Sequence, residues 1–407
     1  MADERPRIRP IEVMPVQTAG RQAFLLRDPQ RLATKEVIVP ADMAFLLSQF
    51  DGTHTIREAQ VSYVRRFGTL LTSDRIVKLL DQLDEALLLD SERFRELRSQ
   101  MEDEFRRQPV RRATHAGQAY EAGAAAFVRE WEPLLDAASP PQDFALDSQR
   151  PLLIAPHYDM KSAAECYAAA YKLMQAAAQP EVAIILGVAH NGGGTPFMLT
   201  RKPFETPFGA LDPDWETIDR LAASAPFDVF ADEFLHRDEH SIEFQAALLH
   251  FLYREVEPPK IVPILCGSYH RMGAEVSDPA ENGAASAFLD ALHDALASDP
   301  RRVALIASAD LSHTGMRFGD QGPLTHTHLE LSRRHDMALL EKAQAGDTAG
   351  LYQLLAQEKD RYNICGFPAI YALLAATPVR EGRLLSYRQS LDPQTQSCVS
   401  FASVGLR

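Results

Sequence analysis

Four predicted strands of this 407-residue chain share one feature: each is an apolar run that ends in residues able to do chemistry. The apolar runs are 152–155, 182–188, 261–265 and 303–307. The residues that follow them include His157, His190, Cys266, Asp310 and His313. Open α/β sheets bind their ligands at the carboxyl ends of the strands. Because histidines recur at these ends, the sequence predicts that they line one shared site.

Two polar pairs can support chemistry at such a site. Asp310 lies three residues before His313, and a carboxylate beside an imidazole orients it and raises its basicity. The pair therefore suits either acid/base chemistry or support of a metal ligand. Glu239 and His240 lie just before an apolar helix, which places them at the edge of a site. Capping of that helix is the alternative role for this pair.

The cysteines do not form a disulfide pattern. Cys166, Cys266, Cys365 and Cys398 are scattered, and none belongs to a C-x-x-C motif. Cys365 lies in N-I-C-G-F-P at the predicted start of a helix, where the helix N-terminus lowers the pKa of a thiol. Alternatively, Cys365 is a small buried side chain that packs like an apolar residue. Cys266 remains a further candidate because it ends a strand.

Composition narrows the classes of function. The formal net charge of −14 argues against general attraction to nucleic acid or to anionic membranes. No apolar run reaches the length of a membrane span. The first ten residues, M-A-D-E-R-P-R-I-R-P, contain no apolar signal core, so we expect a cytoplasmic protein. Residue types do not indicate the oligomeric state.

Residues 1–107 are predicted to form a small winged-helix domain that ends in a charged helical linker. Expected strands are 11–16 and 22–26, expected helices are 40–50, 55–67 and 73–87, and the expected wing strand is 87–89. Thr55 and Glu58 fit a capping box, and Gly68 is a helix stop. This domain holds 17 Lys and Arg against 18 Asp and Glu. A near-neutral domain is poorly suited to binding DNA.

Residues 108–407 are predicted to form an α/β domain. Expected strands are 152–155, 182–188, 227–231, 261–265, 303–308, 383–390 and 397–404. Expected helices are 161–177, 215–224, 241–254, 282–297, 327–345, 348–357 and 366–376. Strands that alternate with helices predict a central, mostly parallel sheet with helices on both faces.

The small domain resembles a known type of winged helix. Its segment P-A-D-M-A-F-L-L-S-Q-F-D-G-T-H-T-I-R-E-A is similar to PqqD-like domains, with F-D-G-T-H-T as the most specific part. The resemblance implies that this domain binds a peptide or a partner protein.

The large domain resembles the Memo family, called AmmeMemoRadiSam system protein B in prokaryotes. The resemblance rests on motifs in order: R-R-A-T-H-A-G-Q-A-Y, I-A-P-H, L-G-V-A-H, F-E-T-P-F-G, D-E-H-S-I-E, I-V-P-I-L-C-G, S-A-D-L-S-H-T-G-M-R-F, I-C-G-F-P and S-C-V-S-F-A-S-V-G. The family is similar in fold to LigB-type class III extradiol dioxygenases, which hold Fe(II) with two His and one carboxylate. The resemblance implies His157, His190 and Cys365 as metal ligands, with Asp310, His313, Glu239 and His240 nearby.

This chain departs from the family pattern at three places. The glycine and tyrosine usual after P-H are replaced, S-S-D-F-C-H is S-A-D-L-S-H, and I-C-G-R-H-P is I-C-G-F-P. The ligand types are kept, and two imidazoles with a thiolate suit Fe(II), copper or zinc. The shape and charge of the substrate site are not carried over by the resemblance.

Three hypotheses follow for function. The first is a Memo-type metal-binding protein with redox or oxygen chemistry on an unknown substrate, and Fe(II) as the expected ion. The second is an extradiol-type dioxygenase acting on a catechol, with His313 or His240 as the acid/base; the cysteine in place of a carboxylate counts against it. The third is a non-enzymatic adaptor that binds a peptide or protein through residues 1–107. Family context implies radical-SAM or AMMECR-type proteins as partners.

Overall fold

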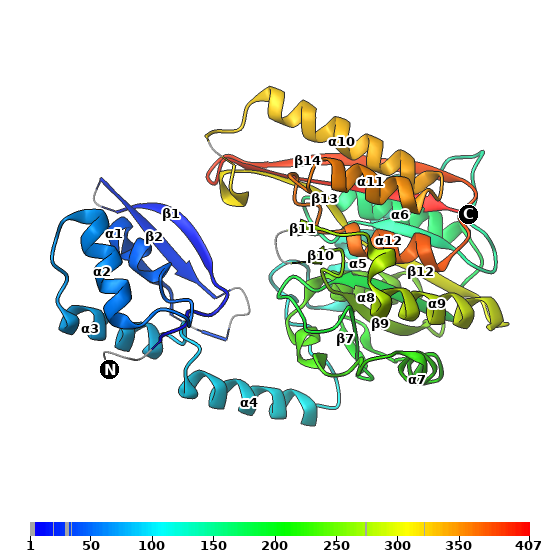
Figure 1. Cartoon of the computed structure of the whole chain (residues 1–407). Coiled ribbons are helices and arrows are strands. Elements are labelled where there is room, and N and C mark those ends of the chain that lie inside the picture. Colours follow the sequence, from blue (N-terminus) through cyan, green and yellow to red (C-terminus); the bar gives the residue numbers. More distant parts are fainter. Residues whose placement is uncertain (1–4, 19, 29–31, 34, 273–274, 321) are drawn as a thin grey trace. The chain divides into compact units, whose positions relative to one another are not determined.

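The computed structural model describes residues 5–407 apart from 19, 29–31, 34, 273–274 and 321. The chain forms two compact units, residues 1–107 and 108–407 (Figure 1). Across the described ranges, no helix is long and apolar enough to cross a membrane.

The N-terminal unit is a three-stranded antiparallel sheet followed by helices. Its strands are β1 (Glu12–Thr18), β2 (Arg21–Arg27) and β3 (Val37–Pro40), in the order β1-β2-β3. Its helices are α1 (Ala41–Leu47), α2 (Ile56–Phe67), α3 (Ser73–Glu85) and α4 (Glu92–Arg107). The predicted capping box is confirmed, since Glu58 N–H donates to Thr55 Oγ1 (3.2 Å) and Thr55 N–H donates to the Glu58 carboxylate (2.8 Å). Gly68, with φ 67°, ends α2 as predicted.

The wing strand predicted at residues 87–89 is wrong. Leu87 has φ 57° and turns the chain at the end of α3, where its N–H donates to Asp84 O (2.9 Å). Of this stretch only Leu89 makes a strand-like contact, as a single bridge to Ile8. Leu87 therefore ends the helix, and the side chains of Leu88 and Leu89 pack in the core.

The large unit is built on an eight-stranded sheet with the order β13-β15-β4-β12-β5-β9-β6, and β14 pairs with β15. The parallel strands are β4 (Leu152–Ala155), β5 (Val182–Val188), β9 (Lys260–Cys266) and β12 (Val303–Ser308). The antiparallel strands are β6 (Phe197–Leu199), β13 (Asp310–Gly315), β14 (Gly382–Asp392) and β15 (Ser397–Leu406). The predicted fold class, an α/β sheet flanked by helices, is confirmed.

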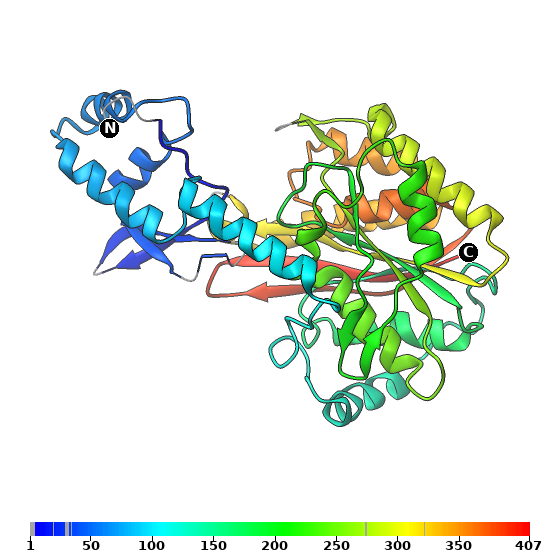
Figure 2. The ribbon, with the colours of Figure 1, turned by 90° about the horizontal axis from the view of Figure 1, so that it is seen from below.

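Alternate residues along the buried strands point into two cores. On β5, Ile184 and Leu186 pack in one core, whereas Ala183 and Ile185 pack in the other. Helices α5 (Ala124–Ala137), α6 (Ala164–Ala176) and α8 (His240–Leu252) cover the second core. The first core is covered by α7 (Trp215–Ser224), α9 (Gly283–Ser298), α10 (His326–Gln344), α11 (Thr348–Gln357) and α12 (Phe367–Ala376). Helices therefore lie on both faces of the sheet (Figure 1, Figure 2).

Short elements complete the large unit. They are β7 (Phe204–Thr206) with β8 (Gly209–Leu211), β10 (Arg271–Met272) with β11 (Glu275–Val276), and the 3-10 turns η1 (Glu233–Arg237), η2 (Pro279–Glu281) and η3 (Met316–Phe318). The strand predicted at 227–231 is wrong. Phe230 N–H donates to Asp228 Oδ1 (2.9 Å), so the aspartate turns the chain, while Val229 packs in the core.

A buried carboxylate ties α10 to three strands of this sheet. Asp336 on α10 accepts hydrogen bonds from the hydroxyls of Ser312 (2.5 Å), Ser400 (2.6 Å) and Tyr387 (2.8 Å), which lie on β13, β15 and β14. Burial raises the pKa of Asp336 to about 6, although the three hydroxyl donors act to lower it. The folded protein therefore favours the protonated carboxyl, and its stability falls as pH rises toward and through 6.

We expect Asp336→Asn to remove this pH dependence, because the amide stays neutral. Between pH 4 and 7 the free energy of unfolding of the wild type should fall, relative to the variant, by about 1–3 kcal/mol. Urea denaturation at several pH values measures the difference. Equal pH dependence in both proteins would contradict the account.

Candidate metal centre

Three neighbouring parallel strands deliver the central residues of the site. The order β4-β12-β5 places the carboxyl ends of these strands side by side. His157 follows β4 by two residues, His190 follows β5 by two, and Asp310 follows β12 by two. The ring centroids of the two histidines lie 4.9 Å apart. The sheet order therefore brings together side chains that are far apart in the sequence.

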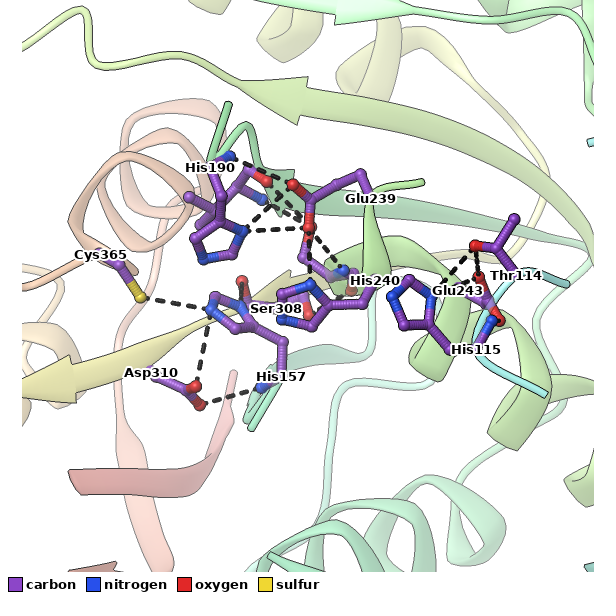
Figure 3. Close-up of polar contacts among 12 residues, drawn as sticks. Thr114, His115, His157, His190, Glu239, His240, Glu243, Ser308, Asp310 and Cys365 are labelled. Atoms are coloured by element: carbon purple, nitrogen blue, oxygen red, sulfur yellow. Dashed lines mark hydrogen bonds and ion pairs between the residues drawn. The ribbon is translucent and has the colours of Figure 1, made fainter. Parts of the chain in front are cut away.

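His157 is held in one orientation by its backbone surroundings. Its Nδ1 donates to Ser308 O (2.9 Å), which leaves Nε2 3.2 Å from Cys365 Sγ (Figure 3). Asp310 Oδ1 accepts from the backbone N–H groups of His157 (3.0 Å) and Tyr158 (3.1 Å). Asp310 Oδ2 lies 3.6 Å from His157 Nε2. Asp310 therefore fixes the backbone of His157, and Ser308 O fixes its ring.

Glu239 holds both the backbone and the ring of His190. Its carboxylate accepts from the His190 backbone N–H (3.1 Å) and from His190 Nδ1 (3.0 Å), and it caps α8 through Ser241 N–H (3.0 Å). The same carboxylate lies 3.2 Å from Nδ1 of His240, whose ring stacks on that of His190 with centroids 4.9 Å apart (Figure 3). Glu239 therefore caps a helix and orients two imidazoles at once.

An irregularity in β13 lets Asp310 and His313 serve one site. Residues three apart on a regular strand face opposite sides of the sheet. The pairing of β13 with β15 shifts register between these two residues, which is the signature of a β-bulge. His313 Nδ1 donates to Leu311 O (2.9 Å), and its ring is hydrogen-bonded to Cys365.

The loop that carries Cys365 is built from strained backbone. Lys359, Asp360 and Asn363 have φ of 51°, 49° and 49°, a region that costs of the order of 1–3 kcal/mol for residues other than glycine. Gly366 N–H donates to Asp310 O (3.1 Å), so the loop docks directly on β13. Contact with β13 therefore sets the position of the thiol.

The imidazoles of His157, His190, His240 and His313 share one hydrogen-bonding pattern. Each presents Nδ1 to an oxygen: the carbonyl of Ser308 or Leu311, or the carboxylate of Glu239. This pattern makes Nδ1 a donor and leaves Nε2, in the neutral imidazole, as the nitrogen that can bind a metal, which is the arrangement that metal-binding histidines use. Among the residues that the structure describes, two groups of three have ligand atoms within 4.8 Å of one another, close enough to hold an ion. They are His157 with His190 and His240, and His157 with Asp310 and Cys365.

The charges of the cluster favour a thiolate. Burial acts to raise the pKa of Cys365, but neighbouring His157 and His313, with hydrogen bonds from His157 and His190, hold it well below its usual value. Burial alone would lower the pKa of His157, yet Asp310 and Cys365 raise it to about 9. Burial opposes the ionised form of Glu239 too, but His190 and His240 hold its pKa well below the usual range. Protonated imidazoles therefore balance the thiolate of Cys365 and the carboxylate of Glu239, and a metal cation can take the place of those protons.

Comparison with known proteins supports one family. The sequence profile of the Memo-like protein family matches residues 111–405. The chain belongs to the Memo family.

Relatives show how far the similarity extends. A MEMO1 family protein of Aquifex aeolicus is 27% identical over 405 residues, which is 98% of this chain and 99% of that protein. One of Thermus thermophilus is 30% identical over 354 residues, 86% of this chain and 99% of that protein. One of Desulfurococcus amylolyticus is 31% identical over 242 residues, 59% of this chain and 76% of that protein. The match to the Aquifex protein includes the N-terminal unit.

The site of this Memo protein contains every candidate residue named from the sequence except Cys266. They are His157, His190, Glu239, His240, Asp310, His313 and Cys365. Their division into metal ligands and acid/base groups stays a prediction. Cys266 lies outside the two candidate metal groups, and burial raises the pKa of its thiol.

Sequence reasoning missed His115. Its ring lies 5.7 Å from that of His240, and its Nδ1 is 3.0 Å from Glu243 (Figure 3). The residue stands in R-R-A-T-H, a motif quoted for the family but given no role.

We expect Gly366→Ala to weaken the site without changing a donor atom. A Cβ at this position would lie 2.4 Å from Asp310 O and 2.5 Å from the Ala309 side chain, so the Cys365 loop must move away from β13. Overpacking of this kind costs about 1–3 kcal/mol. Metal titration and thermal unfolding should both show a loss.

Gly283→Ala is the matched control, because nothing lies within 4 Å of the added methyl group. It should leave metal affinity unchanged. An unchanged affinity in Gly366→Ala would contradict the role given to the loop.

Proposed function

We propose that this Memo protein binds one metal ion through Nε2 of His157, Nε2 of His190 and Sγ of Cys365. The observation that carries the proposal is the shared Nδ1 pattern, which aims several Nε2 atoms at a thiol held as thiolate. Neutral imidazole and thiolate are the forms in which these side chains bind metals. Side-chain exposures of 2% for His157 and 32% for His190 describe a centre that is buried on one side and accessible on the other.

The donor set points to a transition metal. Two nitrogens and one sulfur suit iron(II), copper and zinc, whereas magnesium and calcium prefer oxygen ligands. We propose Fe(II) as the resident ion, with copper or zinc as the alternatives. Iron or copper would supply redox or oxygen chemistry at the centre.

The remaining polar residues have roles that do not require them to bind the ion. Asp310 holds the backbone of His157 and lies beside its ring, and Glu239 holds both the backbone and the ring of His190. In His240 and His313, Nδ1 is engaged with an oxygen acceptor, which leaves Nε2 as the nitrogen available for proton transfer, and the ring of His313 is also hydrogen-bonded to Cys365. We propose that these two imidazoles bind the substrate and move its proton.

We expect His157→Ala and Cys365→Ala each to lower metal affinity at least tenfold, about the smallest loss seen when support around a metal ligand is removed. Metal content of anaerobically purified protein, measured per chain, tests this. Cys266→Ala makes the same substitution outside the two candidate metal groups and should retain the ion. Wild-type metal content in both His157→Ala and Cys365→Ala would contradict the proposal.

Ring cleavage of a catechol is a more specific version of this function. The imidazoles of His240 and His313 favour it, since such chemistry needs an acid/base beside the ion. The thiolate of Cys365 in place of a carboxylate argues against it. Oxygen uptake by the iron-loaded protein with a panel of catechols distinguishes ring cleavage from other chemistry at the metal. No uptake rejects ring cleavage.

The N-terminal unit supports a second candidate function, that of an adaptor. In the sheet order β1-β2-β3, strand β3 is an edge, and Ile38 on it is 55% exposed. An extended peptide can add to such an edge as a further strand. We propose a peptide or protein partner here, with radical-SAM and AMMECR-type proteins as candidates.

Changing the edge of β3 tests the adaptor function. Ile38→Asp in the full chain should reduce partner capture and leave metal content unchanged, because the apolar contact at the edge is lost. Equal capture of a partner by the wild type and by Ile38→Asp would count against this surface.

A further inference from the structure

A single buried arginine connects the start of the large unit to the metal centre. Arg111 is fully buried, and its guanidinium donates to His236 O (2.8 Å), Glu239 O (2.7 Å) and Arg112 O (2.8 Å). It also forms an ion pair with Glu243. The planar fork of a guanidinium can bind several fixed acceptors at once, which a lysine ammonium cannot do in the same geometry.

Glu243 gives this arginine a fixed anchor. Its carboxylate accepts from the His115 backbone N–H (2.9 Å), His115 Nδ1 (3.0 Å) and the Tyr120 hydroxyl (2.6 Å). Burial acts to raise the pKa of Glu243, but Arg111 and His115 lower it far enough to keep the carboxylate ionised. A buried charge pair of this kind is costly to break from one side, because the remaining charge stays unpaired.

The contacts of Arg111 lie on both sides of the segment that orients the histidines. His236 belongs to η1, and Glu239 is the N-cap of α8. With carbonyls 236 and 239 both bound, the backbone that carries the Glu239 side chain is fixed. That side chain is the acceptor for Nδ1 of His190 and His240. A shift of the backbone would therefore turn both rings.

We propose that Arg111 is a positioning residue of the metal centre, which acts through Glu239 to aim Nε2 of His190 and His240. It touches neither the proposed ligands nor the ion, and it lies 128 residues away from Glu239 in sequence. The effect of Arg111 on metal affinity can be tested only if the proposed function holds. Its effect on the positions of the rings can be tested in the metal-free protein, whatever the function.

Arg111→Lys is the informative substitution. The ammonium keeps the charge that Glu243 needs, so folding should be retained, but the contacts to carbonyls 236 and 239 cannot all be made. Arg301→Lys is the matched control. Arg301 also binds several acceptors, Asp214 (3.0 Å), Asp299 (2.8 Å) and Thr217 (3.2 Å), but it precedes β12 and so lies at the opposite end of that strand from Asp310.

The first readout is the imidazole nitrogen NMR spectrum of metal-free protein labelled at histidine. Arg111→Lys should shift the signals of His190 and His240, and Arg301→Lys should leave them in place. Unmoved signals in Arg111→Lys overturn the positioning role whether or not the protein binds metal.

The second readout is a double-mutant cycle on zinc affinity. Arg111→Lys alone and Glu239→Gln alone should each weaken binding by about 10–100-fold. If Arg111 acts through Glu239, the double variant should bind about as weakly as Glu239→Gln alone, whereas Arg301→Lys should leave affinity unchanged on either background. Full additivity of the two losses overturns the proposal. A wild type that binds no zinc, iron or copper would instead refute the proposed function.

Discussion

The site depends on two carboxylates, Asp310 and Glu239, that are buried at the carboxyl edge of the sheet. An ionised group in such a place is costly unless hydrogen bonds and opposite charge compensate it. Backbone N–H groups supply part of this compensation: those of His157 and Tyr158 for Asp310, and those of His190 and Ser241 for Glu239. Glu239 also accepts from Nδ1 of His190, so compensation of its charge and orientation of that histidine are one set of interactions, whereas burial raises the pKa of Asp310.

The rest of the centre comes from departures from regular structure. The bulge in β13 turns Asp310 and His313 toward one cluster, and the strained loop before α12 delivers Cys365 to it. The two histidines follow regular strands by two residues each, whereas strained loop backbone holds the thiol. Gly366 joins the two parts, because only a residue with no side chain fits against Asp310 O. Strain of this kind persists only where the surrounding packing enforces it.

The sequence predicts the strand ends well, because four-to-seven-residue apolar runs followed by polar residues are local patterns. His157 and His190 could be assigned to one edge for this reason, and the α/β class followed from alternation. Contacts across more than a hundred residues, such as that of Arg111 with Glu239, leave no local pattern. The strand expected at 227–231 failed because Asp228 turns the chain within an apolar run. The wing strand predicted at 87–89 is wrong because Leu87 adopts a left-handed conformation, which a leucine in the sequence does not predict.

The most direct measurement is X-ray absorption at the zinc edge of protein loaded with one zinc ion, a probe that is silent to redox chemistry. The account predicts one sulfur at about 2.3 Å and nitrogen ligands at about 2.0–2.1 Å, with the sulfur absent in Cys365→Ala. A zinc site with only nitrogen and oxygen ligands in the wild type, or a sulfur ligand that persists in the variant, would contradict it.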